Sequence, residues 1–188
     1  MIIVEGPDGA GKSHLVGMLS EDLGIPVHER AVRDRLGPAD PQGASLWKWA
    51  YNDVTTWPSQ PMSIYDRHPL VSEYIYGPII RGVSAPGFNH PSAHGLRRQM
   101  EQRCLLVLCL PPHEVYLANL KQEEQMEGVD EHALQLYGLY EALISSWGGW
   151  RVVYDFVPWT HGDESQYEHV KMSVRLHAAQ WKKNLTYT

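Results

Sequence analysis

The sequence predicts an α/β fold in which one parallel sheet is covered by helices on both faces. Short apolar runs alternate along the chain with segments whose apolar residues recur at helical spacing, an order typical of strands joined by helices. The chain has 188 residues, which suits one domain and leaves little room for a second. Hydrophobic residues make up 43% and charged residues 20%, as in a globular protein with a core. We therefore expect a single three-layer domain over residues 1–188.

Five apolar runs are expected to form the strands of this sheet. They lie at residues 1–5, 25–28, 62–65, 104–110 and 151–157. Near-continuous apolar runs are typical of strands that are buried on both faces. The strongest run, 104–110, is ended by Pro111-Pro112, and the last run is ended by Pro158, because proline cannot continue a central strand.

The segments between these runs have the spacing of amphipathic helices. In residues 12–23, leucines recur at every fourth position, and Gly24 stands where a helix C-cap belongs. Further helices are predicted over residues 45–57, 70–80, 115–120, 136–147 and 167–181, and one more begins with Ser92 as its cap. Residues 82–95 have no period and are rich in glycine, proline, serine and histidine. We expect a flexible surface loop there that orders when a ligand binds.

Composition also excludes several classes of protein. The net charge of −6 argues against a protein that coats nucleic acid, because such domains usually carry a basic surface. The longest apolar run is far shorter than the roughly 20 residues that span a bilayer, and no basic region precedes an apolar stretch at the N-terminus. We therefore expect a cytoplasmic protein without a membrane segment. Cys104 and Cys109 are predicted to be buried thiols rather than a disulfide.

Residues 6–13, Gly-Pro-Asp-Gly-Ala-Gly-Lys-Ser, fit the phosphate-binding pattern Gly-x4-Gly-Lys-Ser/Thr. They lie between the first predicted strand and the first helix, which is the context that this pattern requires. Backbone N–H groups of such a loop and the helix N-terminus bind phosphates. The sequence thus predicts a P-loop NTPase fold with ATP and Mg²⁺ as cofactors. The nucleotide-binding residues are Gly6, Gly9, Ala10, Gly11, Lys12 and Ser13, with Lys12 on the outer phosphates and Ser13 on Mg²⁺.

A second polar motif, Tyr65-Asp66-Arg67-His68, follows the third predicted strand. Ligands bind at the carboxyl ends of the strands in open parallel sheets. There Asp66 can hold hydrated Mg²⁺, and Arg67 can bind a phosphate through paired hydrogen bonds. A surface ion pair between Asp66 and Arg67 is the alternative. The guanine-reading motif Asn-Lys-x-Asp is absent and the chain is too short for a two-lobed protein kinase, which leaves a small phosphotransferase.

Together these motifs resemble the thymidylate kinase branch of the deoxynucleotide and deoxynucleoside kinases. Ser72-x3-Tyr76 also resembles a family motif, although one extra residue separates it from Asp66. The resemblance covers residues 1 to about 157 and implies a fold like that of nucleoside monophosphate kinases. It implies that Asp8 contacts the acceptor sugar or its phosphate, that Arg67 binds the acceptor phosphate, and that Asp155 lies near adenine. The residues expected to bind the acceptor are Asp8, Arg30, Arg67, His68, Ser72, Tyr76 and Lys121, with His68 orienting Arg67.

The chain departs from this family in the segment that would form the lid. Thymidylate kinases carry arginines in a lid after the fourth strand or one within the phosphate loop, but no arginine occurs here between Arg103 and Arg151. The lid-like segment, residues 121–130, offers only Lys121 as a cation. An arginine finger can contribute ~10³ or more in rate, so the charge must come from elsewhere. The candidates are Lys12, Arg30, Arg67 and Lys121.

Glu29 is the candidate general base of the reaction. It ends the second predicted strand, where related deoxynucleoside kinases place a carboxylate that takes the proton of the attacking hydroxyl. A solvated surface glutamate is the alternative.

These observations predict a Mg²⁺-dependent kinase that transfers the γ-phosphoryl of ATP to a deoxynucleotide, a thymidylate-like monophosphate. A homodimer is compatible with this interpretation. A second hypothesis changes the acceptor to the hydroxymethyl group of a modified pyrimidine in DNA, of the 5-hydroxymethyluracil type, as in some phage-encoded kinases resembling this family. Two arginine clusters could line a DNA groove: Arg30, Arg33 and Arg35, and Arg97, Arg98 and Arg103. A third hypothesis is a non-catalytic module in which ATP only orders residues 82–95.

Overall fold

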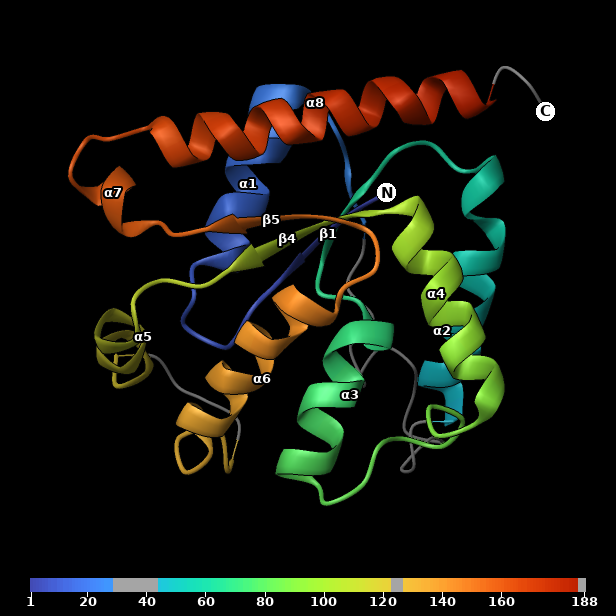
Figure 1. Cartoon of the computed structure of the whole chain (residues 1–188), viewed down its shortest axis with the longest axis horizontal. Helices are drawn as coiled ribbons and strands as arrows, with labels where there is room; N and C mark the ends of the chain where they lie inside the picture. Colours follow the sequence, from blue (N-terminus) through green and yellow to red (C-terminus); the bar gives the residue numbers. More distant parts are fainter. Residues whose placement is uncertain (29–43, 123–126, 186–188) are drawn as a thin grey trace.

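The computed structural model describes residues 1–28, 44–122 and 127–185. These residues form a five-stranded parallel sheet with the order β2-β3-β1-β4-β5, which confirms the predicted α/β fold (Figure 1). The strands are β1 (Ile2–Glu5), β2 (Val27–His28), β3 (Ile64–Asp66), β4 (Leu105–Cys109) and β5 (Trp150–Tyr154). Because all five strands run in the same direction, the segments that follow β1, β3, β4 and β5 leave the sheet at one edge.

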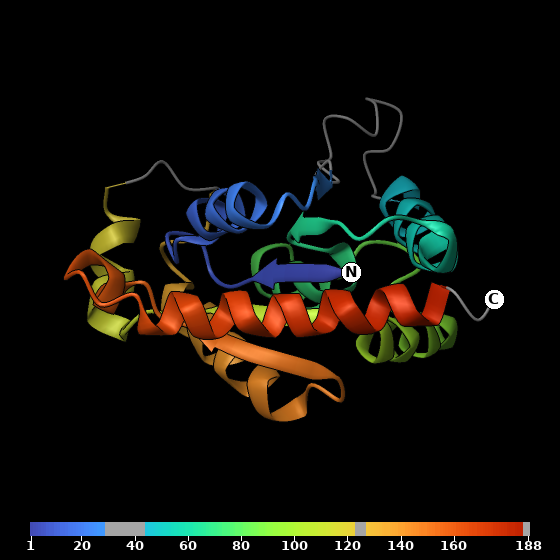
Figure 2. The same ribbon diagram turned by 90° about the horizontal axis from the view of Figure 1, so that it is seen from above.

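Alternate residues of each strand point to opposite faces of the sheet, and each face has its own hydrophobic core. Ile3, Tyr65 and Leu106 belong to the core formed with α2 (Ala44–Thr56), α3 (Pro69–Ile80), α4 (Pro91–Arg103) and α6 (Ala133–Ser146). Ile2 and Val4 belong to the other core, which is formed with α1 (Lys12–Leu23) and α8 (Ser165–Leu185) (Figure 2). This period of two follows from strand geometry and explains the continuous apolar runs in the sequence.

Most predicted elements agree with the structure within a few residues, but one strand end is wrong. The fifth strand ends at Tyr154 rather than at Val157. Val157 and Pro158 instead open the short helix α7 (Val157–Thr160), because proline is tolerated in the first turn of a helix, where its missing N–H would have no partner. The remaining elements are α5 (His113–Leu120) and a 3-10 turn at Trp57–Ser59.

The expected loop over residues 82–95 is shorter than predicted. Helix α4 begins at Pro91, and its cap is His90, whose Nδ1 accepts a hydrogen bond from the Ser92 backbone N–H, so Ser92 is not the cap. Residues 82–90 are anchored to α3: Phe88 is fully buried, and its carbonyl accepts a hydrogen bond of 2.9 Å from the Tyr74 hydroxyl. The burial of Phe88 could not be predicted, because a single buried aromatic residue produces no hydrophobic period in the sequence.

Two further expectations about the chain can be compared with the structure. Cys104 and Cys109 are free and buried, as predicted. Within the described ranges, every helix is too short or too polar to cross a membrane.

Candidate active site

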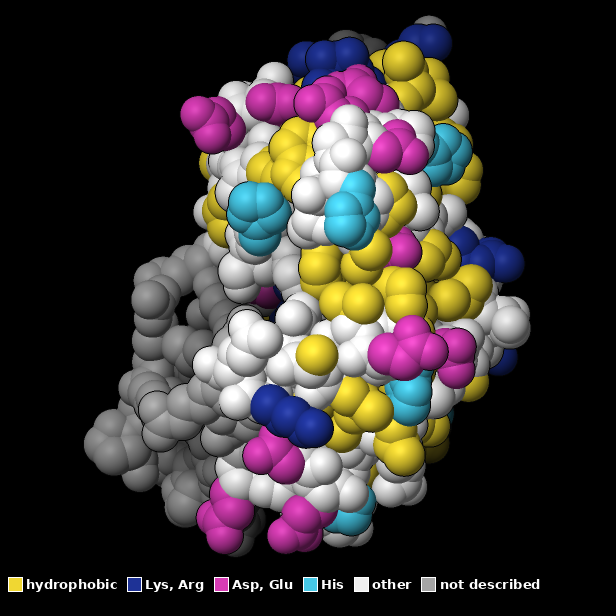
Figure 3. All heavy atoms as spheres, turned by 90° about the vertical axis from the view of Figure 1, so that its left-hand side faces the viewer, with side chains coloured by type: hydrophobic (Ala, Val, Ile, Leu, Met, Phe, Trp, Pro, Cys, Tyr) yellow, Lys and Arg dark blue, Asp and Glu magenta, His cyan; other side chains and the backbone are white. Residues whose placement is uncertain are grey.

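The glycine-rich loop joins β1 to α1 at the edge of the sheet where the strands end. Gly6 packs so closely on β4 that a Cβ atom there would lie 2.4 Å from the carbonyl oxygen of Cys109. Gly11 is the N-cap of α1 and has φ of 77°, a left-handed conformation that glycine adopts without steric cost. Figure 3 views this side of the molecule and shows a hollow with acidic and basic atoms at its bottom. Helix α1 thus begins at a glycine-rich loop, where backbone N–H groups at the helix N-terminus can bind an anion.

The Lys12 side chain folds back onto this loop. Only 7% of it is exposed, and its Nζ donates a hydrogen bond to the carbonyl oxygen of Pro7. Burial, together with the positive charge of Arg67, lowers the pKa of Lys12 to about 8. Near neutral pH the ammonium is therefore charged, and it can exchange the Pro7 carbonyl for a phosphate oxygen.

This pKa predicts that ATP binding weakens in alkaline solution. Above pH 8 the free protein loses the Lys12 proton, so the Kd of ATP should rise by up to about tenfold per pH unit. The phosphate groups do not add to this slope, because their second pKa of about 6 lies well below the range. Isothermal titration between pH 7 and 10 measures it. In the Lys12→Arg variant the side chain keeps its charge, and the same slope there would contradict the assignment to Lys12.

Ser13 and Asp66, the two residues predicted to hold Mg²⁺, lie in direct contact. The Ser13 hydroxyl donates a hydrogen bond of 2.9 Å to Oδ2 of Asp66. The other carboxylate oxygen, Oδ1, is buried and has no hydrogen-bond partner among the described residues. Mg²⁺ is usually bound by one or two protein oxygens, with waters and phosphates completing its shell. The donor set and the orphaned Oδ1 therefore fit Mg²⁺.

Arg67 lies across the site from the phosphate loop and points toward it. It is 8% exposed. Its Nη2 donates to Asp8 of the loop and, over 3.0 Å, to the Tyr76 hydroxyl. Tyr76 in turn donates to the second oxygen of Asp8 at 2.9 Å. Arg67 thus pairs with Asp8, whereas Asp66 bonds to Ser13, so the surface pair between Asp66 and Arg67 is not formed.

The charges of this cluster support one another. Burial acts to raise the pKa of Asp8, but the nearby charges of Arg67 and Lys12 outweigh it and the pKa is lowered. The pKa of Arg67 is raised, because its contacts with Tyr140, Tyr76 and Asp8 outweigh the effect of burial. Both side chains are therefore ionised at neutral pH. They form a compact pair beside the position where a phosphate would enter.

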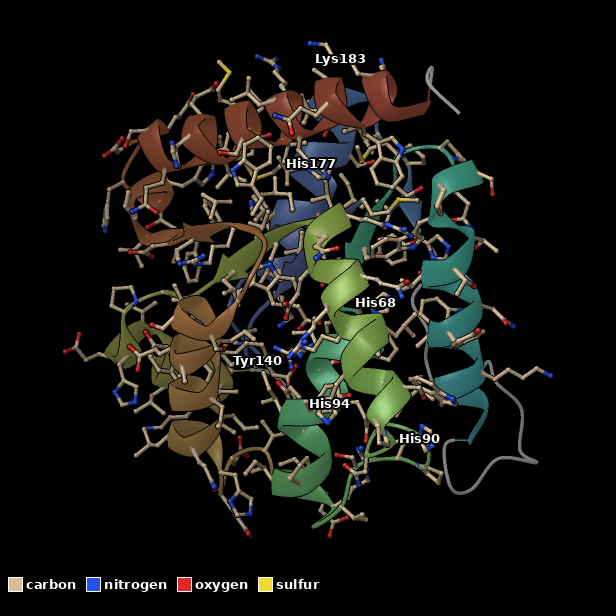
Figure 4. All side chains as sticks on the ribbon, turned by 45° about the vertical axis from the view of Figure 1, so that its right-hand side comes forward. His68, His90, His94, Tyr140, His177 and Lys183 are labelled. Atoms are coloured by element: carbon tan, nitrogen blue, oxygen red, sulfur yellow. The ribbon has the colours of Figure 1, made fainter. Side chains whose placement is uncertain are left out.

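His68 occupies a different place from the one predicted. Its side chain is fully buried and caps α3, with Nδ1 accepting a hydrogen bond of 3.2 Å from the Leu70 N–H. Its Nε2 lies 3.3 Å from Asp53 of α2, and its ring packs against Trp49 and Trp57 (Figure 4). The His68 side chain therefore contacts neither Arg67 nor the hollow. Only its backbone N–H is directed to the site cluster, toward Glu5.

The other predicted acceptor residues have separate positions. Tyr76 belongs to the Arg67 cluster, whereas the half-buried Ser72 donates its hydroxyl to the His68 carbonyl at 3.2 Å and so serves the first turn of α3. Lys121 is exposed and directly follows α5. The end of α5 lies against the phosphate loop, because the Asn119 side chain donates to the Gly9 carbonyl at 3.1 Å. Glu29 and Arg30 fall outside the described residues.

The segment after β5 also borders the loop. Asp155 accepts a hydrogen bond of 2.9 Å from the Val157 N–H and so opens α7. The neighbouring Phe156 ring lies against Gly11, where an added Cβ would come within 3.0 Å of it. The predicted adenine region around Asp155 thus adjoins the phosphate loop through Phe156.

Sequence reasoning missed two members of the cluster, Glu5 and Tyr140. Glu5 is the last residue of β1 and is fully buried, and Tyr140 lies on α6 with its hydroxyl 2.9 Å from Arg67. In the sequence both appeared only as parts of apolar patterns. A carboxylate at the end of a buried strand, directly before a glycine loop, was the signal that could have identified Glu5, since such a charge is rarely buried without a partner.

The sheet order, the glycine loop and the helix that follows it define a P-loop α/β fold of the kind found in small kinases. Several solved structures share this fold. YorR from Bacillus subtilis, in complex with phosphorylated GDP, has a TM-score of 0.68 at 17% identity over 94% of this chain and 97% of its own. Deoxyadenosine kinase from M. mycoides with bound dATP has a TM-score of 0.54 at 16% identity, with 93% and 98% covered.

A third similar structure is a sugar kinase from Janibacter sp., with a TM-score of 0.50 at 12% identity and 95% of each chain covered. No family model matches the chain, and no curated protein matches its sequence. At these identities the similar structures show the fold, while the resemblance to thymidylate kinases stays a prediction.

Proposed function

We propose that the protein is an ATP-dependent kinase that transfers the γ-phosphoryl group to a deoxynucleotide acceptor, a thymidylate-like monophosphate. The observation that carries this proposal is the Arg67 guanidinium, which faces the phosphate loop and bonds to Asp8 within it. A protein that only binds ATP needs the loop. A kinase whose acceptor carries a phosphate also needs a cation to bind that phosphate, and Arg67 supplies one beside the loop.

The residues divide the work by position. The loop amides and Lys12 hold the triphosphate, and Lys12 leaves the Pro7 carbonyl to do so. Ser13 and Asp66 would hold Mg²⁺, which when bound neutralises charge on the phosphates. Arg67 binds the acceptor phosphate, and Asp8 and Tyr76 are placed to hydrogen-bond its sugar. Catalysis on this arrangement consists of positioning and charge neutralisation, which is what phosphoryl transfer chiefly requires.

The similar structures support a nucleoside-containing acceptor. Two of them are described as a deoxyadenosine kinase with bound dATP or dCTP, and a third holds phosphorylated GDP. The hypothesis of a DNA acceptor is favoured by the lid-like segment, which lacks the arginines that thymidylate kinases carry there. One of the arginines in the second cluster is already engaged, since Arg97 pairs with Glu101 and stacks on Trp147.

Labelled ATP, Mg²⁺ and a panel of acceptors test the proposal. The panel holds the deoxynucleoside monophosphates, the free deoxynucleosides, and duplex and single-stranded DNA containing 5-hydroxymethyluracil. We expect label on a monophosphate. Label on DNA alone would assign the acceptor to the second hypothesis, and tight ATP binding without any labelled acceptor would leave a non-catalytic module.

Arg67→Lys tests the acceptor site within the same assay. Lysine keeps the charge but loses the planar fork, so kcat/KM for the acceptor should fall by about 10²-fold, with the KM of ATP unchanged. Arg98→Lys is the matched control, because Arg98 is exposed on α4. An Arg67→Lys variant that is as active as Arg98→Lys would remove Arg67 from the acceptor site.

A further inference from the structure

Glu5 is a buried carboxylate that the proposed chemistry does not use. It has no exposed surface. Its Oε1 accepts a hydrogen bond of 2.8 Å from the His68 backbone N–H, and its Oε2 accepts one of 3.0 Å from the Tyr140 hydroxyl. A buried carboxylate is costly unless it is paired, so a purely apolar residue would be the simpler choice at the end of β1. The free-energy cost of burying this carboxylate therefore indicates that Glu5 has a role beyond packing.

Both contacts of Glu5 lead to Arg67. The Tyr140 hydroxyl accepts a hydrogen bond of 2.9 Å from Nη1 of Arg67, and Nη1 itself lies 3.9 Å from Oε2 of Glu5. On the backbone side, the N–H that Glu5 binds belongs to the residue directly after Arg67. Glu5 therefore restrains Arg67 at both ends, at its side chain through Tyr140 and at its peptide through His68.

The backbone of Arg67 needs such a restraint. Among the described residues it is the only one other than glycine with a positive φ, at 70°. For a residue with a long side chain this conformation costs about 1–3 kcal/mol and persists only where the surroundings enforce it. The turn sends the side chain back over the phosphate loop, where Nη2 meets Asp8 and Tyr76. Nη1 is left for Tyr140.

We infer that Glu5 and Tyr140 are positioning residues that hold the Arg67 guanidinium in place for the acceptor. Nη1 is fixed by the Tyr140 hydroxyl, and Nη2 is directed into the site. This inference rests on the proposed kinase function and deepens it. Asp8 and Tyr76 can yield their bonds to an incoming acceptor, whereas Tyr140 and Glu5 are fully buried and keep theirs. The guanidinium would thus be preorganised before the acceptor arrives, which is how a buried second layer supports a site.

The kinetic test uses Tyr140→Phe and Glu5→Gln. Tyr140→Phe removes the bridge, and Glu5→Gln removes the negative charge and places an amide donor against the Tyr140 hydroxyl. For each variant we expect the KM of the acceptor to rise by about 10–100-fold, with the KM of ATP changed less than twofold. Tyr154→Phe is the matched control: Tyr154 is also buried in the core, and its hydroxyl has no hydrogen-bond partner within the described ranges. A merely structural role would move both KM values together.

An NMR measurement tests the inference without relying on turnover. In the wild type and in Tyr154→Phe, Nη1 and Nη2 of Arg67 should give separate ¹⁵N signals because rotation about the Nε–Cζ bond, which exchanges the two nitrogens, is hindered. The Arg67→Lys variant provides the assignment. In Tyr140→Phe and Glu5→Gln the exchange between the two signals should become faster, because the guanidinium is then held chiefly by the contacts of Nη2 with Asp8 and Tyr76. An exchange rate in both variants as slow as that of Tyr154→Phe would overturn the inference, and so would faster exchange with an unchanged acceptor KM. A wild type that holds Arg67 rigid yet phosphorylates no acceptor would instead reject the proposed function.

Discussion

Replacing Lys12 with alanine is expected to reduce kcat/KM for phosphoryl transfer by about 10³-fold, because the variant loses the only side-chain cation that the phosphate loop itself contributes. The arginine-free sequence between Arg103 and Arg151 makes the effect larger than it would be if a lid arginine also reached the transferred phosphate. The folded state should survive the change. Burial lowers the pKa of Lys12 to about 8, which means that the protein holds this charge at a net cost despite its attraction to Asp8.

Steady-state kinetics with ATP and the best acceptor of the panel measure the loss, and thermal unfolding checks the fold. Lys182→Ala is the matched control, since Lys182 is exposed on α8 and far along the chain from the loop. Retention of more than a tenth of the wild-type activity in Lys12→Ala, with the fold intact, would contradict the role of Lys12. A large decrease of the unfolding temperature in Lys12→Ala, with none in Lys182→Ala, would mean that the Lys12 side chain stabilises the loop instead.

The phosphate loop and the strand and helix on either side of it were predictable because their signals are local. Residues 6–13 form a contiguous pattern, and the apolar runs on either side fix its context. Asp66 and Ser13 could be paired in advance for the same reason: each directly follows a predicted strand or begins a predicted helix, and parallel strands bring such positions to one edge. The structure places the two side chains in hydrogen-bond contact.

The second layer of the site was not predictable because its contacts join distant parts of the chain. Tyr140 and Glu5 are hydrogen-bonded across 135 positions in the sequence. Helical spacing placed Tyr140 on the buried face of α6, but spacing says nothing about where a hydroxyl on that face finds its partner. His68 failed for the opposite reason. Its position beside Arg67 suggested a shared role, but the chain turns at Arg67, which has a positive φ of 70°, and the His68 ring is buried toward α2.

Gly6→Ala is expected to be the most destabilising single-atom addition in the site, lowering the free energy of unfolding by about 3 kcal/mol or more. Two effects combine. The new Cβ would lie 2.4 Å from the Cys109 carbonyl oxygen, a backbone atom of the central sheet that cannot rotate away, and Gly6 has φ of 148°, which L-residues rarely adopt. Urea denaturation followed by fluorescence of the tryptophans measures the change.

Gly17→Ala provides the matched control for this effect, because it adds the same methyl group in the same region of the chain. Gly17 is exposed in the middle of α1, and apart from its chain neighbours and the surrounding helix backbone no atom of the described residues lies within 4 Å of its added Cβ. Alanine there should raise the free energy of unfolding by roughly 0.5–1 kcal/mol. The two substitutions should therefore have opposite signs. Equal stabilities of Gly6→Ala and Gly17→Ala would mean that the loop does not pack on β4 as described, and the anion site that depends on this close approach would have a different shape.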